Sequence, residues 1–436
     1  MENQLSVQVP GDKSLTQRAL ILSALAEGES RISGLLWGGD AESTATALRA
    51  LGAGIPEIPS DGGEMVVQGV GLTGLCGPGS ELDLGNSGTG ARLLMGVLAG
   101  SGIETTMTGD ESLRSRPMRR VTEPLSAMGA GFDFRGEAGR LPIRVEGRRP
   151  LKAVDWSTPV ASAQVKSAIL LAALTGGTSA VVTEPRKSRD HTERLFHQVG
   201  VSTRSQAVAE GWRIELHDPP DRISELDFHV PGDVSSAAFL LALAALGGTA
   251  AGSIEIARVG LNPTRTAFLD VIQRMGADIT VETHDDHDEN GESSGTVSAR
   301  ASALTGTQVG GAEVPRMIDE LPLVAVLGAH AQGETSIRGA HELRAKESDR
   351  IDAMVRNLRS LGVQVEEHDD GLTVLGSDAP LTGNVKAFGD HRIAMAFGIL
   401  GAVPGNHIQV DDPGASGVSF PGFWELLHDL GAGAAV

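Results

Sequence analysis

The sequence has only one cysteine, Cys76, among its 436 residues. A single cysteine excludes an internal disulfide framework and is typical of a reducing compartment. Long hydrophobic runs are also missing, because the longest, residues 237–246, has the length of a buried helix and not of a membrane span. The opening residues, MENQ, lack the basic and apolar segments of a signal peptide. We therefore expect a cytoplasmic protein with no membrane partner.

Positive charge is scarce as well: 36 lysines and arginines stand against 56 aspartates and glutamates, which gives a formal net charge of −20. Nucleic acids and anionic membranes select basic surfaces, so we expect neither as a partner. A small anionic substrate is still compatible, because a local cluster of cations dominates within a Debye length of about 8 Å. The length exceeds that of one ordinary hydrophobic core, which favours two domains.

The chain does contain a pattern that occurs six times. In each copy a stretch such as ALRALGA or VIQRMGA closes on a glycine, and an apolar segment such as RALILSALAEG lies upstream. The closing glycines are Gly52, Gly129, Gly200, Gly276, Gly362 and Gly431. Their separation of about 70 to 85 residues suits a small αβ module better than a solenoid unit. The pattern predicts two helices per module, with a β-branched strand between them and two alternating strands after them.

Each upstream helix is predicted to begin behind a short polar loop. The six loops read PGDKS, LGNSGTG, ASAQ, PGDVSS, RMIDE and FGDHR. A helix N-terminus carries unpaired N–H groups and the positive end of the helix dipole. Several such ends directed at one cleft would form a binding site for anions.

The first two loops contain candidate anion ligands. Lys13, Ser14 and Arg18 lie where a strand passes into a helix, with Arg18 one turn from Ser14 and on the same side. An ordinary N-cap beside solvated cations has the same pattern, so this alternative stays open. Asn86 and Gly88 belong to a glycine-rich run whose backbone N–H groups suit a phosphate.

Further candidates follow in the second and third modules. Arg116 directly precedes a proline, which favours an extended conformation at the arginine. Ser162 and Gln164 lie at the third helix start, and Ser188 and Arg189 follow in KSRDHT. Each is explicable as capping or solvation when taken alone, but their recurrence at equivalent loops is not.

The fifth and sixth modules add acids to the cations. Asp319 precedes a uniformly apolar run, where it is either an N-cap or a buried acid/base. Lys346 and Arg350 are four residues apart, with Glu347 between them. Like charges at this helical spacing repel, which favours an anion held between them. The last loop adds Arg392.

One low-complexity stretch, ETHDDHDENGESSG at residues 282–295, is expected to form an acidic, solvated hairpin tip. His284, Asp285, Asp286 and His287 have the side chains of metal ligands, but no ordered scaffold is indicated around them. We therefore expect no metal site in this stretch.

Seven segments together resemble the 5-enolpyruvylshikimate-3-phosphate synthase family: PGDKSLTQRAL, LGNSGTGARLL, RSRPM, ASAQVKSAILLA, SRDHTE, RAKESDR and FGDHRIAMAF. They occur in the family's order from about residue 9 to residue 420. The resemblance implies an α/β fold of two domains, each of three βαβαββ repeats, with helix N-termini facing the interdomain cleft. It also implies that the first strand belongs with the C-terminal half, which gives domains of residues 13–232 and of residues 1–12 plus 233–436.

The resemblance also implies a reaction, the transfer of the enolpyruvyl group of phosphoenolpyruvate to the 5-hydroxyl of shikimate 3-phosphate with release of phosphate. Protonation of C3 makes C2 electrophilic, the hydroxyl adds to give a tetrahedral ketal, and phosphate leaves as the new methyl group loses a proton. Family correspondence makes Asp319 and Glu347 the acid/base pair, with Lys13 touching both substrates. No cofactor, redox chemistry or metal is implied.

The same correspondence assigns the binding residues. The implied ligands of shikimate 3-phosphate are Lys13, Ser14, Arg18, Ser162, Gln164, Ser188, Arg189, Asp319 and Lys346. The implied ligands of phosphoenolpyruvate are Lys13, Asn86, Gly88, Arg116, Gln164, Arg350 and Arg392. The two phosphates and two carboxylates of the substrates carry roughly −5 to −6 in total, which the lysines and arginines and the helix ends are able to balance.

Three positions depart from the family's pattern. Val418 stands where many relatives have lysine, which puts the strength of the carboxylate site in doubt. Ala163 replaces a second serine found in the enterobacterial pattern. Leu93 occupies a position that is often proline, beside the loop that governs glyphosate sensitivity in the family.

Two alternatives stay open. The sister UDP-N-acetylglucosamine enolpyruvyl transferases share the architecture but typically carry a reactive cysteine in a second-module loop, where this chain reads GDESLRSRPM. Cys76 lies earlier and is expected to be a half-buried thiol. A non-catalytic anion-binding protein of the same fold would gain nothing from Asp319 and Glu347 among its cations. We expect a monomer.

Overall fold

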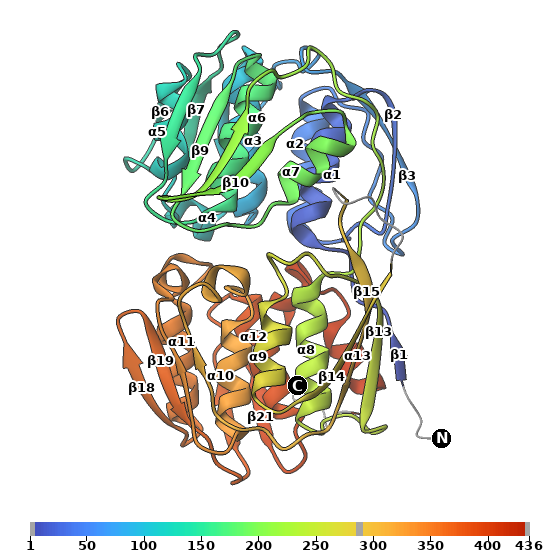
Figure 1. Cartoon of the computed structure of the whole chain (residues 1–436), viewed down its shortest axis with the longest axis vertical. Coiled ribbons are helices and arrows are strands. Elements are labelled where there is room, and N and C mark those ends of the chain that lie inside the picture. Colours follow the sequence, from blue (N-terminus) through green and yellow to red (C-terminus); the bar gives the residue numbers. More distant parts are fainter. Residues whose placement is uncertain (1–4, 285–290, 432–436) are drawn as a thin grey trace. The chain divides into compact units, whose positions relative to one another are not determined.

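The structure is a computed structural model that describes residues 5–284 and 291–431. The chain folds into two compact units, which Figure 1 shows coloured along the sequence. The inserted unit consists of residues 11–230 with 291–292, and the terminal unit consists of residues 5–10, 231–284 and 293–431. Asp285, Asp286 and His287, candidate metal ligands in the acidic stretch, lie outside the described residues.

The inserted unit contains three modules. The first module comprises α1 (Lys13–Leu25), β2 (Glu27–Ser33), α2 (Gly39–Ala50), β3 (Met65–Val70) and β12 (Asp227–His229). The second comprises β4 (Leu82–Asp83), α3 (Gly88–Ser101), β5 (Glu104–Thr108), α4 (Glu111–Ser115), α5 (Arg119–Ala127), β6 (Gly131–Phe134) and β7 (Ile143–Glu146). The third comprises β8 (Val154–Ser157), α6 (Ala163–Gly176), β9 (Ala180–Glu184), α7 (His191–Gln198), β10 (Arg204–Val208) and β11 (Gly211–Leu216).

The terminal unit contains the other three modules. The fourth comprises β1 (Leu5–Val7), α8 (Val234–Ala245), β13 (Ser253–Gly260), α9 (Ala267–Arg274), β14 (Asp278–His284) and β15 (Ser294–Arg300). The fifth comprises β16 (Gln308–Val309), α10 (Leu321–His330), β17 (Glu334–Ile337), α11 (Arg350–Ser360), β18 (Gln364–His368) and β19 (Gly371–Leu375), with 3-10 turns at Val314–Arg316 and His341–Ala345. The sixth comprises β20 (Thr382–Val385), α12 (His391–Gly401), β21 (His407–Val410), a 3-10 turn at Pro413–Val418 and α13 (Phe423–Asp429).

Four modules share one sheet order: β4-β5-β7-β6, β8-β9-β11-β10, β1-β13-β15-β14 and β16-β17-β19-β18. In each, the two strands that flank the first helix in the module are parallel and the remaining pairs are antiparallel. Parallel neighbours need a crossover, which the first helix supplies in the second, third and fifth modules. The repeated topology explains why the loops before the first helices are equivalent from module to module.

The first and last modules depart from the predicted strand pattern. The first module has the sheet β12-β2-β3, and within the described residues the segment after α2 forms a single bridge, between Gly54 and Gln68. Pro56 and Pro59 lie in that segment, and proline has no N–H to donate to a sheet ladder. In the sixth module the described residues form only the pair β20-β21.

Two first-strand positions are filled from a distant part of the sequence. Strand β1 directly precedes α1 along the chain but pairs in parallel with β13 of the terminal unit. Strand β12 directly precedes α8 but pairs in parallel with β2 of the inserted unit. Each of these two sheets therefore depends on a strand that is distant in the sequence, as in the pairings of Leu5 with Ile254 and of Arg31 with Asp227.

The six closing glycines end the second helix of each module as predicted. Each lies two residues beyond the helix and has a positive φ: 100° at Gly52, 108° at Gly129, 82° at Gly200, 99° at Gly276, 82° at Gly362 and 73° at Gly431. At Gly52 the glycine N–H bonds to the carbonyl of Arg49 and the next N–H to the carbonyl of Leu48. This is a Schellman cap, which needs the left-handed conformation that glycine adopts without strain.

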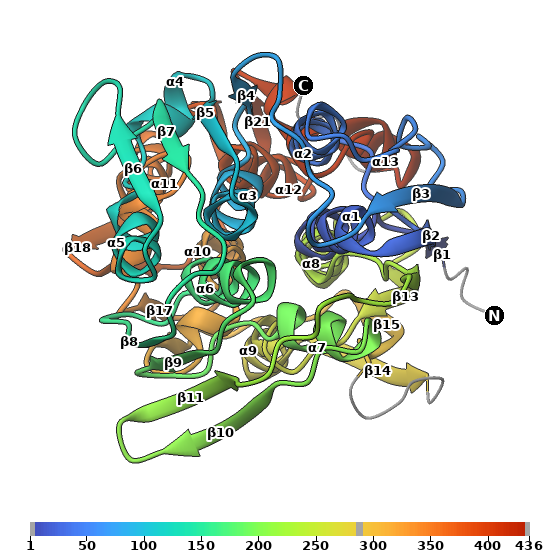
Figure 2. The same cartoon turned by 90° about the horizontal axis from the view of Figure 1, so that it is seen from above.

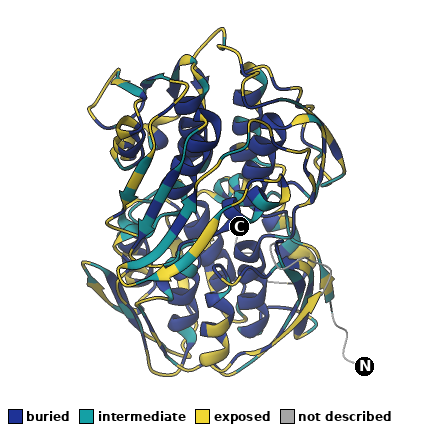
Figure 3. Ribbon diagram, turned by 45° about the horizontal axis from the view of Figure 1, so that its top comes forward, coloured by how far each residue is buried: buried dark blue, intermediate teal, exposed yellow. Residues whose placement is uncertain are grey.

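The first helices of the modules form the interior of each unit (Figure 3). Helices α1, α3 and α6 are buried along most of their length in the inserted unit, and α8, α10 and α12 in the terminal unit. A helix that is apolar on all sides is expected to be buried. None of the helices in the described ranges has the length and apolar character needed to cross a membrane.

Helices α3 and α6 pack backbone to backbone (Figure 2). A Cβ added at Gly96 of α3 would lie 2.3 Å from the carbonyl oxygen of Ala168 in α6, and one at Gly100 would lie 2.6 Å from that of Ala172. Any side chain at these glycines would force the helices apart. This close approach sets the relative positions of the two helix starts that carry candidate site residues.

Candidate functional site

The candidate residues belong to two groups, one in each unit. The group in the inserted unit comprises Lys13, Ser14, Arg18, Asn86, Gly88, Arg116, Ser162, Gln164, Ser188 and Arg189. The group in the terminal unit comprises Asp319, Lys346, Glu347, Arg350 and Arg392.

The N-cap of α1 is Asp12, whose Oδ1 accepts the N–H of Leu15 at 2.8 Å. Capping therefore does not account for Ser14, and the alternative of an ordinary cap beside a solvated arginine is wrong for Arg18. That side chain is only 3% exposed. Lys13 is the first residue of the helix, and its Nζ lies 3.2 Å from Oδ2 of Asp40.

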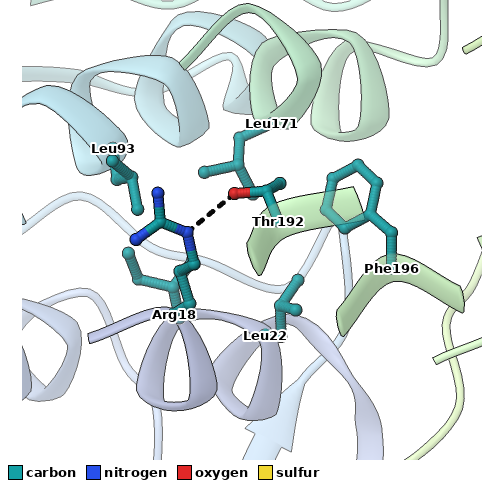
Figure 4. Close-up of a pocket in the computed structure, with 7 residues that line it drawn as sticks. Arg18, Leu22, Leu93, Leu171, Thr192 and Phe196 are labelled. Atoms are coloured by element: carbon teal, nitrogen blue, oxygen red, sulfur yellow. Dashed lines mark hydrogen bonds between the residues drawn. The ribbon is translucent and has the colours of Figure 1, made fainter. Parts of the chain in front are cut away.

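Arg18 donates hydrogen bonds to three hydroxyl groups, and Figure 4 shows the bond to Thr192. Its Nη1 donates to the hydroxyl of Ser14 at 2.5 Å, which confirms the predicted side-by-side placement. Its Nε donates to Oγ1 of Thr192 at 2.8 Å, and its Nη2 to Oγ of Ser167 at 3.1 Å. These neutral acceptors solvate the guanidinium without cancelling its charge.

Apolar side chains complete the pocket around Arg18. Leu22, Leu93, Leu171 and Phe196 surround it in Figure 4. Burial lowers the pKa of Arg18 to about 10, in spite of the opposite effects of the nearby carboxylates of Glu193 and Asp12. Leu93, one of the departures from the family pattern, is fully buried in this wall.

Side-chain hydrogen bonds join the starts of α1, α3 and α6. Gln17 of α1 donates through Nε2 to Oγ of Ser87, the N-cap of α3, at 2.7 Å. Gln164 of α6 donates through Nε2 to Oγ1 of Thr89 in α3 at 2.9 Å. The Oε1 of Gln164 accepts from Nη1 of Arg92 at 2.9 Å. The three helix starts of the inserted unit therefore lie together, as the equivalent loops predicted.

Arg92 is a functional candidate that the sequence analysis missed. It is 3% exposed and lies one turn after Gly88, so its Nη1 also donates to the carbonyl of Gly88 at 3.2 Å. A Cβ added at Gly88 would lie 2.9 Å from Nη1 of both Arg92 and Arg116. A basic residue in the first turns of an otherwise apolar helix is the signal that finds it, because Arg18 has the same placement.

Arg116 is extended, with φ −82° and ψ 145°, as its position before Pro117 predicted. It is 6% exposed, and its Nη2 donates to Oδ1 of Asn86 at 2.5 Å. The amide nitrogen of Asn86 donates to Oδ2 of Asp110 at 2.7 Å. Asn86, Gly88 and Arg116 are therefore neighbours at the start of α3.

Ser162 and Ser188 share one buried acid, Glu184 at the end of β9. The backbone N–H of Ser162 donates to Oε1 at 2.8 Å, and the hydroxyl of Ser188 donates to Oε2 at 2.7 Å. Ser162 is also the N-cap of α6 and accepts the N–H of Val165, which leaves its own hydroxyl hydrogen for another acceptor. Glu184 was not predicted.

Lys166 of α6 was also missed. It is fully buried, and its Nζ donates to the carbonyl of Arg189 at 2.9 Å. Its Nζ lies 2.7 Å from Oε1 of Glu193 and 3.7 Å from Oε2 of Glu184. Burial by itself lowers the pKa of Lys166, but the two carboxylates outweigh it and the pKa is raised.

In the terminal unit Arg350 is the centre of the group. It is 1% exposed, and its Nε donates to Oδ2 of Asp390 at 2.8 Å and its Nη2 to Oδ1 of the same residue at 3.2 Å. The Nη1 donates to Oδ1 of Asp319 at 3.2 Å, and Nη2 donates to Oε2 of Glu347 at 2.7 Å. Burial opposes the charge, but the carboxylates of Asp390, Glu347 and Asp319 raise the pKa of Arg350 above its ordinary value.

The geometry decides between the two interpretations of Asp319. The N-cap of α10 is Glu320, so the capping alternative for Asp319 is wrong. The carboxylate of Asp319 instead faces cations, since Oδ1 also accepts from Nζ of Lys346 at 3.3 Å. The predicted spacing argument for Lys346 and Arg350 is wrong in its details, because α11 begins only at Arg350 and the two are not on one helix. A shared acid, and not helical repetition, brings them together.

Arg392 differs from Arg350 in its surroundings. It is 3% exposed, and its guanidinium carbon lies 5.8 Å from the ring centroid of Phe239, in cation–π range. Its Nε and Nη1 are buried and find no hydrogen-bond acceptor within residues 5–284 and 291–431. An anionic ligand that accepted from these two nitrogens would offset the cost of burying the guanidinium.

The fourth module holds a polar cluster that the sequence analysis did not single out. Arg265, 3% exposed, donates through Nη2 to Oγ of Ser235 at 2.7 Å and to Oδ1 of Asp233 at 3.2 Å. Ser235 donates in turn to Oε1 of Glu320. This cluster links the start of α8 to the residue next to Asp319.

Cys76 and Val418 are two further residues that the sequence singles out. Cys76 is exposed, so the prediction of a half-buried thiol is wrong. The segment around it is a turn-rich connection between modules, and such connections lie at the surface. Val418 ends the last 3-10 turn and is partly buried.

Each of the two groups has chemistry suited to phosphorylated acids. The inserted unit gathers buried cations and hydroxyls at three helix starts, and the terminal unit places two carboxylates on a common guanidinium. Helix starts with cations bind phosphates and carboxylates. Carboxylates held by a shared cation are suited to exchange protons with a substrate.

Comparison with known proteins agrees with this chemistry. A solved structure titled as the enolpyruvyl transferase NikO from Streptomyces tendae has the same fold, with a TM-score of 0.73 at 17% identity over 99% of this chain and 95% of that one. The fold is therefore that of the two-domain enolpyruvyl transferases, as predicted. At this identity the likeness shows the fold alone.

Residues 3–427 match the family model of EPSP synthase (3-phosphoshikimate 1-carboxyvinyltransferase). A 3-phosphoshikimate 1-carboxyvinyltransferase of Alkalilimnicola ehrlichii is 47% identical over 98% of this chain and 93% of its own length. The EPSP synthase structure from Acinetobacter baumannii has a TM-score of 0.82 and 37% identity over 99% of this chain and 96% of that one. The chain belongs to the EPSP synthase family, which confirms the resemblance found in the sequence.

Proposed function

We propose that this protein is a 3-phosphoshikimate 1-carboxyvinyltransferase, an enzyme of the shikimate pathway to aromatic amino acids. It transfers the enolpyruvyl group of phosphoenolpyruvate to the 5-hydroxyl of shikimate 3-phosphate and releases phosphate. Family membership over residues 3–427 supports the reaction. The structural observation that carries it is the contact of Arg350 with both Asp319 and Glu347, the two acids that the chemistry requires.

The binding residues for shikimate 3-phosphate are assigned by family correspondence, and the local geometry supports several of them. Ser14 and Arg18 are joined side by side, and we assign the carboxylate and ring of the substrate to them. The phosphate is assigned to Ser162, Ser188 and Arg189, supported by the shared contact of both serines with Glu184. The remaining assigned ligands are Lys13, Gln164, Asp319 and Lys346.

The phosphate of phosphoenolpyruvate is assigned to Asn86, Gly88, Arg116 and Gln164, with Lys13 touching both substrates. The bare Cα of Gly88 supports this assignment, since the Nη1 atoms of Arg92 and Arg116 both lie 2.9 Å from the place of a missing Cβ. An anionic oxygen approaching the start of α3 would meet both guanidinium groups. We therefore add Arg92 to the phosphate ligands.

The carboxylate of phosphoenolpyruvate is assigned to Arg350 and Arg392. Arg392 brings buried N–H groups that no described residue accepts. Arg350 has four of its five N–H donors on carboxylates, two on Asp390 and one each on Asp319 and Glu347. A bound carboxylate would therefore take the remaining Nη1 hydrogen or displace Glu347.

Asp319 and Glu347 are proposed to move the protons. One group must protonate C3 of phosphoenolpyruvate and later remove a proton from the new methyl group, and another must accept the proton of the 5-hydroxyl. Two carboxylates on one guanidinium suit these tasks, because release of either from Arg350 raises its basicity. Lys346, 3.3 Å from Asp319, supplies a second positive charge at the same oxygen.

The proposed activity is tested by phosphate release from purified protein with shikimate 3-phosphate and phosphoenolpyruvate. UDP-N-acetylglucosamine serves as the control acceptor, since it would support turnover by the sister enzyme. We expect phosphate only with shikimate 3-phosphate. Turnover with the nucleotide sugar alone, or with neither acceptor, would contradict the proposal.

We further propose that the enzyme is a monomer and that it works in the cytoplasm, since a lone cysteine, Cys76, is typical of a reducing compartment. Light scattering coupled to size-exclusion chromatography would give a mass near 45.2 kDa for a monomer. A mass of twice that value would contradict it.

A further inference from the structure

Glu184 is an acid where a phosphate site would not be expected to have one. It is fully buried at the end of β9, and its two oxygens are divided between two chain segments. Oε1 accepts the backbone N–H of Ser162 at 2.8 Å. Oε2 accepts the hydroxyl of Ser188 at 2.7 Å and its N–H at 3.4 Å. The carboxylate therefore ties the start of α6 to the loop that carries Ser188.

Lys166 also links the start of α6 to the loop that carries Ser188 and Arg189. It lies on α6, one turn after Ser162, and its Nζ donates to the carbonyl of Arg189 at 2.9 Å. The Nζ lies 3.7 Å from Oε2 of Glu184 and 2.7 Å from Oε1 of Glu193. Both Lys166 and Glu184 have fully buried side chains, so neither is a solvated surface charge.

The charges of the pair have opposite consequences for a bound phosphate. The carboxylate of Glu184 accepts hydrogen bonds from Ser162 and Ser188, the two serines assigned to the phosphate. At this short range it repels a phosphate dianion, and burial makes the repulsion stronger than in water. The ammonium group of Lys166, which Glu184 shares with the closer Glu193, offsets part of this repulsion. Leaving either charge buried without the other is unfavourable, which accounts for their occurrence as a pair.

We propose that Glu184 and Lys166 are positioning residues that hold Ser162, Ser188 and Arg189 as one rigid site for the phosphate of shikimate 3-phosphate. Glu184 sets the distance between the two serines, and Lys166 fixes Arg189 through its carbonyl and neutralises Glu184. This inference rests on the proposed function, which assigns the substrate phosphate to these three residues. Neither residue touches the substrate.

The test compares a ligand that has the phosphate with one that lacks it. Glu184→Gln keeps the shape of the side chain but presents an amide N–H₂ group to one of the two donor segments. We expect the Kd for shikimate 3-phosphate, measured by calorimetry, to rise about tenfold. The Kd for unphosphorylated shikimate should change by less than about twofold, because Ser14 and Arg18 are not affected. A role in general stability would weaken both ligands alike.

Two further variants separate charge from geometry. Lys166→Met leaves Glu184 without its compensating charge, and we expect a rise of roughly thirtyfold in the Kd for shikimate 3-phosphate. The double variant Lys166→Met/Glu184→Gln removes both charges, and its Kd should fall back towards that of Glu184→Gln alone. If Lys166→Met does not fold, Glu184→Gln and the double variant still give the comparison.

Lys187→Met is the matched control. Lys187 lies in the same loop, but it is partly exposed and its Nζ bonds to Oδ2 of Asp190 at 2.8 Å instead of to Glu184. We expect its Kd for shikimate 3-phosphate to stay within about twofold of the wild type.

The inference is overturned if Glu184→Gln folds and binds shikimate 3-phosphate like the wild type, or if it loses shikimate equally. It is also overturned if the double variant binds more weakly than Lys166→Met. Failure of the wild-type protein to bind shikimate 3-phosphate at all would instead refute the proposed function, so the two failures are distinguishable.

Discussion

Arg18 of the inserted unit and Arg350 of the terminal unit are both buried arginines, with 3% and 1% of their surface exposed. Their pKa values shift in opposite directions. Burial lowers the pKa of Arg18 to about 10, and its hydrogen-bond acceptors are the uncharged oxygens of Ser14, Ser167 and Thr192. Burial acts on Arg350 too, but three carboxylates outweigh it and raise the pKa.

The difference indicates that the buried cations of Arg18 and Arg350 have different roles. Arg18 bears the cost of burial without a hydrogen-bonded carboxylate, so an anionic ligand would supply the missing opposite charge and would be bound tightly. Arg350 is already compensated, so a ligand has to compete with its acids, and those acids become available for proton transfer. The inserted unit is therefore expected to contribute mainly binding, and the terminal unit mainly chemistry.

The largest expected effect comes from removing an acid beside Arg350. Asp319→Asn keeps the size of the side chain and an acceptor for Lys346 and Arg350 but cannot exchange a proton. We expect kcat to fall about a thousandfold, with the Kd for shikimate 3-phosphate changed little. Steady-state kinetics and calorimetry measure the two quantities.

Asp352→Asn is the control for this variant, because Asp352 lies on the same unit and pairs with the exposed Arg356. Its turnover should match that of the wild type. A kcat for Asp319→Asn within tenfold of the wild type would remove Asp319 from the mechanism.

The next largest effect is on protein stability, where substitutions of Arg350 and Arg18 can be compared directly. Arg350→Met leaves the carboxylates of Asp319, Glu347 and Asp390 without their shared cation, which should lower the free energy of unfolding by about 3–5 kcal/mol. Arg18→Met should cost less, about 1–2 kcal/mol, because the hydroxyls it leaves remain partners for each other. Ser167 and Thr192 already lie 2.6 Å apart through their hydroxyl oxygens. Urea denaturation that ranks the variants in the reverse order would contradict the comparison.

Arg18→Met should nevertheless have the greater effect on ligand binding. Loss of an uncompensated cation should raise the Kd for shikimate 3-phosphate about thirtyfold. Because Arg18 is assigned to the carboxylate and ring, the Kd for shikimate should rise by a similar factor, measured by calorimetry. A loss confined to the phosphorylated ligand would show that Arg18 binds the phosphate instead.

The smallest effect is expected at Gly88. An added Cβ would lie 2.9 Å from Nη1 of Arg92 and of Arg116, and the ends of these flexible side chains have to move away. We expect Gly88→Ala to raise the KM for phosphoenolpyruvate about tenfold, with the KM for shikimate 3-phosphate nearly unchanged.

Gly77→Ala is the matched control for Gly88→Ala. A Cβ at Gly77 would meet no atom within 4 Å, and the residue does not have a positive φ. Its kinetics should equal those of the wild type. Equal effects of the two substitutions would show that Gly88 acts through the backbone and not through the guanidinium groups.

Much of the fold was predictable because its signals are local. A closing glycine adopts a positive φ through its own backbone freedom, and the predicted starts of α1 and α3 are capped by Asp12 and Ser87 beside them in the sequence. The missed residues depend on distant partners. Arg92 bonds to Gln164 and Lys166 to Glu193, and the first of these pairs is 72 residues apart in the sequence.

The sequence by itself determined the six modules, the burial of their first helices and the chemical types of residue at the loops, since periodicity, caps and glycines act over a few residues. Only the tertiary structure decided which oxygens surround each cation. Arg18 and Arg350 look alike in the sequence, each near a helix start with polar neighbours. Their opposite pKa shifts arise because packing brings Ser167 and Thr192 to one and Asp319 and Asp390 to the other, and electrostatic energy depends on distance in space.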